Sequence, residues 1–425
     1  TYSQLMISSN IKGRLIAMNF LEFAVWGAYL ISMGSFLASI GMGANIGWFY
    51  TVQGIVSLFM PALVGIIADR WIPAQRMLSL CHLVAAGAMI VVGMLAASGE
   101  REFSVLFPWY TLSVAAYMPT LALSNSVSYN ALEGAGLDTV KAFPPIRIFG
   151  TIGFIVSMWI VDLMGWQRTE VQFYVSAAWG LLLAAYALTL PHCPTAPKGE
   201  KKGLAEAFGL DAFRLFGQRK MALFFLFSML LGVSLQITNA YANSFITSFA
   251  ADARYAGAYF VDHANLLISL SQVSETLCIL LIPFFLKRFG IKTVMLMAML
   301  AWVLRFGFFA VGNPAFPGVG LFILSMIVYG VAFDFFNVSG SLFVDKEAPT
   351  SIRSSAQGLF MLMTNGVGAS VGTLSAQAVV NHYVSNIDGV MVGNWPMVWT
   401  IFAAYALVVA VAFVVLFKEE GKAAA

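Results

Sequence analysis

Long runs of apolar residues, separated by short polar stretches, dominate the sequence. A helix that crosses a bilayer needs about 20 mostly apolar residues, and the chain holds twelve runs of this kind. They lie near residues 15–38, 46–68, 77–97, 103–128, 145–164, 171–190, 221–249, 262–286, 293–312, 318–344, 355–380 and 395–417. The pattern therefore predicts an all-α integral membrane protein with twelve transmembrane helices.

The composition agrees with this prediction. Of the 425 residues, 60% are hydrophobic and only 10% are charged, and the mean hydropathy is +0.83. Soluble domains carry about 25% charged residues, so most of this surface must face lipid. The net charge of only +3, with basic residues in short loops, argues against a nucleic-acid-binding protein. The three cysteines form no CxxC pair, which argues against a disulfide framework or a thiolate metal site.

A polar break at residues 191–220 divides the spans into two groups of six. We therefore expect an N-terminal half at 1–190, a cytoplasmic linker at 191–220 and a C-terminal half at 221–425. Apolar residues recur at helical spacing within 204–220, which favours a short amphipathic helix lying along the membrane. A plain connector is the alternative.

The distribution of lysine and arginine predicts the orientation in the membrane. Because the number of spans is even, both termini lie on the same side. Of the 23 basic residues, 18 fall on that side, and only Arg101, Arg168 and Arg254 fall on the other. Loops rich in basic residues favour the cytoplasmic side, so both termini are expected there.

The two halves repeat weakly, as in major facilitator transporters, whose halves rock about a midplane site. The segment 65–76 follows the second span, and the similar segment 283–292 follows the eighth. The matched positions of the fourth and tenth spans are Tyr117 with Asn125 and Tyr329 with Asn337. An acidic–basic pair at a helix end can latch the halves in one state and release them in another. Asp69 and Arg70, in a loop that resembles the conserved loop of that superfamily, are therefore predicted to gate the protein.

Charged side chains inside a bilayer cost at least about 2.5–3.5 kcal/mol at a helix centre, so each is a functional candidate. The predicted spans contain Glu22, His82, Arg147, Glu275, Arg305 and Asp334. Glu22 is a candidate proton carrier, whereas His82 is expected to be a hydrogen-bonded packing residue. Arg305 is expected to neutralise a carboxylate.

One face of the fifth span combines a cation, a hydroxyl and an aromatic ring. Arg147, Thr151 and Phe154 are spaced i, i+4, i+7, which places them on one side of a helix. These groups suit a polar ligand that contains a ring. An arginine that snorkels from the helix end is the alternative for Arg147.

The seventh and eighth spans each carry a polar pair at i, i+3. Gln236 and Asn239 offer uncharged donors and acceptors, although helix–helix hydrogen bonding would also explain them. Gln272 and Glu275 share a face, and Glu275 lies about 20 Å along the helix from its outer end. Burial disfavours a carboxylate anion, so Glu275 is predicted to bind and release a proton. A permanent pair with an arginine is the alternative.

The tenth span combines aromatic rings with an acid. Tyr329 and Phe333 are one helical turn apart, and Asp334 follows them. Aromatic rings beside an acid can stack a planar ligand while bonding its polar edge. Asp334 and Glu275 are both expected to contact the ligand, and Glu275 is favoured as the group that titrates. A structural ion pair is the alternative for Asp334.

No catalytic, cofactor-binding, metal-binding or nucleotide-binding motif is present in the sequence, including the P-loop and HExxH. An enzyme, a cofactor or a bound metal is therefore not expected. Without a nucleotide site, any ligand movement would depend on an ion gradient or on the gradient of the ligand itself.

Several strings are similar to those of the bacterial nucleoside:proton symporters, a family of the major facilitator superfamily. They include FPPIRIFGTIGF, SQVSETL and VYGVAFDFFNVSGS, and the similarity covers nearly the whole chain. The resemblance implies a twelve-helix major facilitator fold that imports nucleosides such as uridine or adenosine with protons across the inner membrane. It also implies that the family's site residues match Arg147, Thr151, Phe154, Gln236, Asn239, Gln272, Glu275, Tyr329 and Asp334. The resemblance departs at Glu22, where a relative has glutamine, so either Glu22 adds a preference of this chain or it is not the shared proton carrier.

Two other interpretations stay open at this point. One is a proton-coupled sugar or oligosaccharide carrier of the same superfamily. The other is an integral membrane enzyme or a receptor, against which the missing catalytic motifs and the half-repeat both argue.

Overall fold

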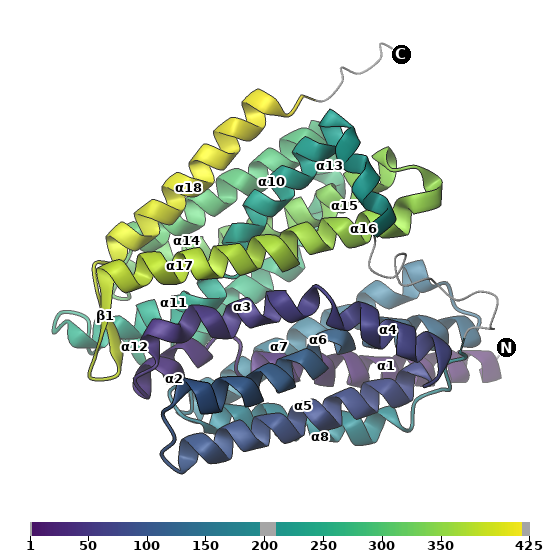
Figure 1. The fold of residues 1–425 in the computed structure, drawn as a ribbon, viewed down its shortest axis with the longest axis horizontal. Helices are drawn as coiled ribbons and strands as arrows, with labels where there is room; N and C mark the ends of the chain where they lie inside the picture. The colour runs from purple at the N-terminus through teal and green to yellow at the C-terminus, as the bar shows by residue number, and fades with distance from the viewer. Residues whose placement is uncertain (1, 196–209, 419–425) are drawn as a thin grey trace. The chain divides into compact units, whose positions relative to one another are not determined.

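The computed structural model describes residues 2–195 and 210–418. The chain forms two compact units, and Figure 1 labels most of their helices. Unit 1 comprises Thr1–Asn45 and Ile55–Ala207, and unit 2 comprises Ile46–Gly54 and Phe208–Ala425. Residues 46–54 group with unit 2, although they belong to the expected N-terminal half.

The first part of the chain is helical almost throughout. Its elements are α1 (Tyr2–Gly27), α2 (Met33–Ser39), η1 (Gly43–Asn45), α3 (Ile46–Ser57), α4 (Met60–Arg70), α5 (Ala74–Ala97), α6 (Phe103–Gly134), α7 (Thr139–Leu163) and α8 (Val171–Ala187). Helix α1 begins well before the expected residue 15, because a helix that has already formed is extended at little cost. The Asp138 side chain caps α7 by accepting a hydrogen bond from the Val140 amide at 3.1 Å.

Glycines bring two helices of unit 1 into direct backbone contact. Helix α1 packs along α7, and α5 packs against both α6 and α8. A Cβ on Gly27 would overlap the main chain of Phe154, and a Cβ on Gly153 would overlap the main chain of Phe20. The α1–α7 contact therefore requires glycine at both positions, and it fixes where the ring of Phe154 lies.

The second part of the chain is also mainly helical. Its elements are η2 (Leu210–Gly217), α10 (Arg219–Leu235), α11 (Ile237–Ser248), η3 (Phe249–Ala251), α12 (Tyr259–Asp262), α13 (Ala264–Val311), α14 (Val319–Gly330), η4 (Val331–Phe335), α15 (Phe336–Glu347), η5 (Thr350–Ile352), α16 (Arg353–Met361), η6 (Leu362–Gly368), α17 (Ala369–Tyr383), β1 (Val384–Ile387), β2 (Val390–Gly393) and α18 (Trp395–Leu416). Of the expected amphipathic helix, residues 204–209 lie outside the described residues, and Leu210–Gly217 form a 3-10 helix instead of an α-helix.

The expected membrane spans all fall on described helices. Among the described residues, eight helical stretches are long and apolar enough to cross a membrane. The longest, α13, has 48 residues and holds two expected spans, because its backbone kinks at Gly290 (φ +82°, ψ 168°). Only glycine adopts such a positive φ at little cost. The fold is therefore the expected all-α membrane architecture.

Two spans of unit 2 contain π-helical turns that the sequence pattern did not predict. Segment η4 separates α14 from α15, and η6 separates α16 from α17. Single π-helical turns inside α-helices are frequent at functional sites. The β1–β2 hairpin, which pairs Ile387 with Val390, joins α17 to α18 (Figure 1).

Candidate functional site

A buried acid–base pair lies inside unit 1. Glu22 on α1 and His82 on α5 are both completely buried, and Glu22 Oε2 lies 2.6 Å from His82 Nε2. The Thr120 hydroxyl on α6 donates to Glu22 Oε1 at 2.5 Å. The Tyr117 hydroxyl donates to the main-chain carbonyl of Glu22 at 2.8 Å. His82 is therefore buried and hydrogen-bonded, as expected, and its partner is Glu22, which the sequence pattern did not identify.

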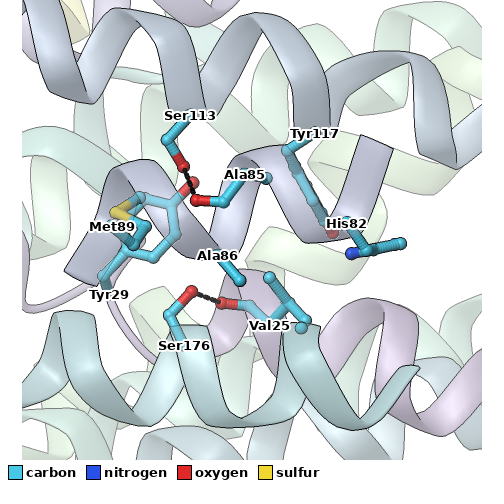
Figure 2. A pocket seen from close by; sticks show the side chains of 10 residues that line it. Val25, Tyr29, His82, Ala85, Ala86, Met89, Ser113, Tyr117 and Ser176 are labelled. Atoms are coloured by element: carbon cyan, nitrogen blue, oxygen red, sulfur yellow. Dashed lines mark hydrogen bonds between the residues drawn. The ribbon is translucent and has the colours of Figure 1, made fainter. Parts of the chain in front are cut away.

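A small cavity borders this pair within unit 1. Its volume is about 10 Å³, which is room for about one water molecule. Figure 2 shows His82 and Tyr117 at one side of the cavity and Tyr29 and Met89 at the other. The hydroxyls of Ser113 and Ser176 also line it, and they donate to the carbonyls of Ala85 at 2.9 Å and Val25 at 2.8 Å.

The face formed by Arg147, Thr151 and Phe154 lies on α7, where aromatic residues of α1 cover part of it. The Arg147 guanidinium lies 3.8 Å from the centre of the Phe23 ring, which is a cation–π contact. Phe154 is buried, and its ring packs edge-on against Trp26 at 6.3 Å. Arg147 and Thr151 are half-buried, and Arg147 lies within the helix, not in the preceding loop.

The polar pair of the seventh span lies at a helix break. Gln236 separates α10 from α11, and the Asn239 amide donates to Gln236 Oε1 at 3.0 Å. Both side chains are half-buried. The break was not predicted, since the apolar pattern continues through it.

Arg305 on α13 is a buried cation surrounded by uncharged groups. Its guanidinium donates to Thr238 Oγ1 at 3.1 Å, to Ser271 Oγ at 3.2 Å and to the Ser325 carbonyl at 3.0 Å. It also lies 4.5 Å from the centre of the Tyr329 ring. Within the described residues its partners are hydroxyls, a carbonyl, a thioether and rings. The expectation that Arg305 neutralises a carboxylate is therefore wrong.

The aromatic and acidic residues of the tenth span lie close together. The rings of Tyr329 and Phe333 are stacked, with centres 5.8 Å apart and planes 15° apart. Asp334 lies in η4 and is only 3% exposed. Its Oδ2 atom is buried and accepts no hydrogen bond from any described residue. A buried acceptor without a partner costs about 1–3 kcal/mol, so this atom is suited to a ligand donor.

Helix α13 brings a second acid to the same place. Glu275 is half-buried and interacts electrostatically with both Tyr329 and Asp334. Gln272, one turn earlier on α13, is buried. The structure thus brings Gln272, Glu275, Tyr329, Phe333 and Asp334 together within unit 2.

The predicted gating residues lie at the end of α4. Asp69 is exposed and Arg70 is half-buried, and the loop Trp71–Pro73 follows them. Their counterparts in the half-repeat, Lys287 and Arg288, are exposed on α13 just before its kink. In residues 2–195 and 210–418, no group of three or more His, Cys, Asp or Glu side chains could hold a metal ion.

Comparisons with known proteins identify the family. Residues 9–422 match the family described as Nucleoside H+ symporter. The chain is 50% identical to the xanthosine permease of Escherichia coli K12 over 96% of each chain, and 47% identical to the nucleoside permease NupG of the same strain over 97% of each. A crystal structure of NupG superposes with a TM-score of 0.89 at 46% identity, covering 97% of this chain and 100% of that one. The chain therefore belongs to the nucleoside:H+ symporter family, whose members are membrane transporters and not enzymes.

Proposed function

We propose that the protein imports nucleosides such as uridine or adenosine together with protons, by alternating access, across the inner membrane of a bacterium. The family assignment and the xanthosine and nucleoside permeases among its relatives support this proposal. The excess of basic residues on one side supports a cytoplasmic location for both termini.

The observation that carries the proposal is the unpartnered Asp334 oxygen beside the Tyr329–Phe333 stack. A nucleoside has a planar base that can stack on rings and ribose hydroxyls that need acceptors. We assign Tyr329 and Phe333 to the base, and Asp334 to a hydroxyl or a base edge. A site that bonds a hydroxyl rejects analogues without it by a large factor.

We assign further candidate ligand contacts to each unit by itself. On α7 of unit 1, Arg147 supplies a fixed cation, Thr151 a hydroxyl and Phe154 an aromatic ring. In unit 2, we assign hydrogen bonds with the ligand to Gln236, Asn239, Gln272 and Glu275. We also propose that Asp69 and Arg70 gate the protein from the end of α4.

Burial is the argument for which of the two acids in unit 2 titrates. Sequence reasoning favoured Glu275 because burial disfavours the anion. Asp334 is the more deeply buried of the two carboxyl groups, whereas Glu275 is half-buried. The same physical argument therefore moves the preference to Asp334, with Glu275 as a ligand contact.

Competition for uptake tests the proposed function. Cells that express the protein should concentrate labelled uridine, and a protonophore should abolish this accumulation. Unlabelled nucleosides should compete, while free bases and pentoses should not. Competition by free sugars without competition by nucleosides would identify a sugar carrier instead, and accumulation that survives the protonophore would contradict proton coupling.

A further inference from the structure

The Glu22 and His82 side chains are ionisable, and neither is among the proposed ligand contacts. The two side chains are completely buried, and their facing atoms are 2.6 Å apart. With one proton the pair is neutral overall, whichever group holds that proton. Removing the proton or adding a second one leaves a net charge in the interior, which is costly. A change in the number of protons here is therefore strongly coupled to the conformation around the pair.

The surroundings of the pair accommodate its different protonation states. Thr120 donates to one carboxyl oxygen and His82 lies against the other, so the carboxylate is hydrogen-bonded when it is charged. The titratable and charged groups around it include Cys81 on α5, Tyr117 on α6, Arg147 on α7 and Tyr29, which lines the same cavity as His82. Cys81 and Tyr117 interact electrostatically with Glu22, and Arg147 interacts with Tyr117.

The second ring nitrogen of His82 offers a way for a proton to enter or leave. Nδ1 is buried and has no hydrogen-bond partner among the described residues. His82 borders the water-sized cavity that Ser113 and Ser176 also line (Figure 2). A hydronium ion that reaches Nδ1 can give its proton to this nitrogen. An N–H bond forms, an O–H bond breaks and a water molecule remains.

We propose that Glu22 and His82 together form a second proton-binding site, contained within unit 1 and served by this cavity, and that the proton bound there is transported with the nucleoside. The site is distinct from Glu275 and Asp334, which lie in unit 2. The inference rests on the proposed symport. Its test must therefore distinguish the loss of one coupled proton from the loss of nucleoside transport itself.

The number of coupled protons gives that separation. Proteoliposomes with an imposed gradient of about one pH unit and no membrane potential should accumulate nucleoside about tenfold for each coupled proton. Glu22→Gln keeps the shape of the side chain but cannot hold the proton, so the limiting accumulation ratio should fall about tenfold. Because this ratio is thermodynamic, a variant that transports slowly still reports it. Glu102→Gln, an exposed carboxyl before α6, is the matched control and should keep the wild-type ratio.

A double variant tests whether the two residues act as one site. Glu22→Gln combined with His82→Gln should lower the limiting accumulation ratio no further than Glu22→Gln alone, because both changes remove the same proton. The exchange of Glu22→His with His82→Glu should restore the wild-type ratio. A further tenfold loss in the double variant would indicate two independent sites and overturn the proposal, as would a wild-type ratio in Glu22→Gln.

A spectroscopic measurement tests the pair without relying on transport. The full chain contains four histidines, and 15N-histidine spectra can follow each of them during a pH titration. The signal that disappears in His82→Gln belongs to His82, and it should change its protonation state together with the carboxyl of Glu22. A His82 signal that is insensitive to pH and to Glu22→Gln would contradict the proposal. If wild-type protein neither binds nor accumulates nucleosides, the proposed function fails instead.

Discussion

The buried polar clusters of the two units differ in how they handle charge. In unit 1, Glu22 has a basic partner, His82, at 2.6 Å. In unit 2, the cation Arg305 is held by hydroxyls, a carbonyl and rings, and the acid Asp334 keeps one oxygen without a partner. In the first cluster, Glu22 and His82 can share one proton. In the second, Arg305 is a fixed positive charge, and one oxygen of Asp334 remains free to accept a hydrogen bond from a ligand.

The half-repeat makes this difference informative. Tyr117 and Tyr329 occupy matched positions of the two halves, and both are buried. The Tyr117 hydroxyl donates to the carbonyl of Glu22, whereas Tyr329 presents its ring to Arg305. The matched positions therefore have different surroundings, next to an acid–base pair in unit 1 and next to a buried cation in unit 2.

Removing the fixed cation of unit 2 should have the largest effect. Arg305→Met leaves Thr238, Ser271 and the Ser325 carbonyl without their donor, at about 1–3 kcal/mol for each unsatisfied group. We expect a loss of at least about 3 kcal/mol of stability, measured as a lower melting temperature of the purified protein. The exposed Arg288→Met is the control, and equal melting temperatures for the two variants would contradict the structural role of Arg305.

Neutralising the unpartnered acid of unit 2 should weaken ligand binding without unfolding the protein. Asp334→Asn keeps the shape but replaces one acceptor with a donor, so nucleoside affinity should fall by about 1–3 kcal/mol, which is about five- to 150-fold. Calorimetric titration of the purified protein measures this change. Asp388→Asn, on an exposed hairpin turn of the same unit, should bind normally. Wild-type nucleoside affinity in Asp334→Asn would contradict the proposal that the unpartnered oxygen of Asp334 binds the ligand.

The cation of unit 1 should matter for the ligand more than for the fold. Arg147→Ala should reduce the initial rate of uptake by about tenfold or more, because a charged hydrogen bond contributes about 1.5–3 kcal/mol. Arg147→Lys should also be impaired, because lysine lacks the planar group that stacks on Phe23. Arg101→Ala, at an exposed position, serves as the control. Near-normal uptake by Arg147→Ala would indicate a snorkelling arginine.

Substitution of the matched tyrosines should give the smallest difference in stability. Tyr117→Phe removes one buried hydrogen bond and should cost about 1 kcal/mol of stability. Tyr329→Phe keeps the ring that contacts Arg305, so the ligand-free protein should melt near the wild-type temperature. If both variants lose the same stability, the distinction between the two clusters does not hold at these positions.

The fold could be predicted from the sequence because lipid imposes a simple pattern. Each span must be apolar for about 20 residues, so hydropathy alone places the helices. The breaks inside the spans could not be predicted in this way. The helix break at Gln236 falls inside a continuing apolar run, and η4 is a π-helical turn whose residues also suit an α-helix.

Residues on one helix could be grouped from their spacing, but partners on different helices could not. Glu22 and His82 are 60 positions apart, and nothing in either local pattern connects them. Sequence reasoning therefore expected a hydrogen-bonded His82 and singled out Glu22, but it could not pair the two. It also assigned a carboxylate partner to Arg305, because it treated charge as the only way to satisfy a buried cation. In the structure, hydroxyls and rings surround the Arg305 guanidinium in place of a carboxylate.

The glycine contact between α1 and α7 has a consequence for engineering this protein. Gly27 and Gly153 set the distance between the two backbones, so a library for altered nucleoside preference should hold both constant. Thr151 is half-buried on the same helix as Phe154, and we propose it as a ligand contact, so it is the position of this face to vary while the helix pair stays fixed. A Cβ at either glycine would instead meet the main chain of the other helix.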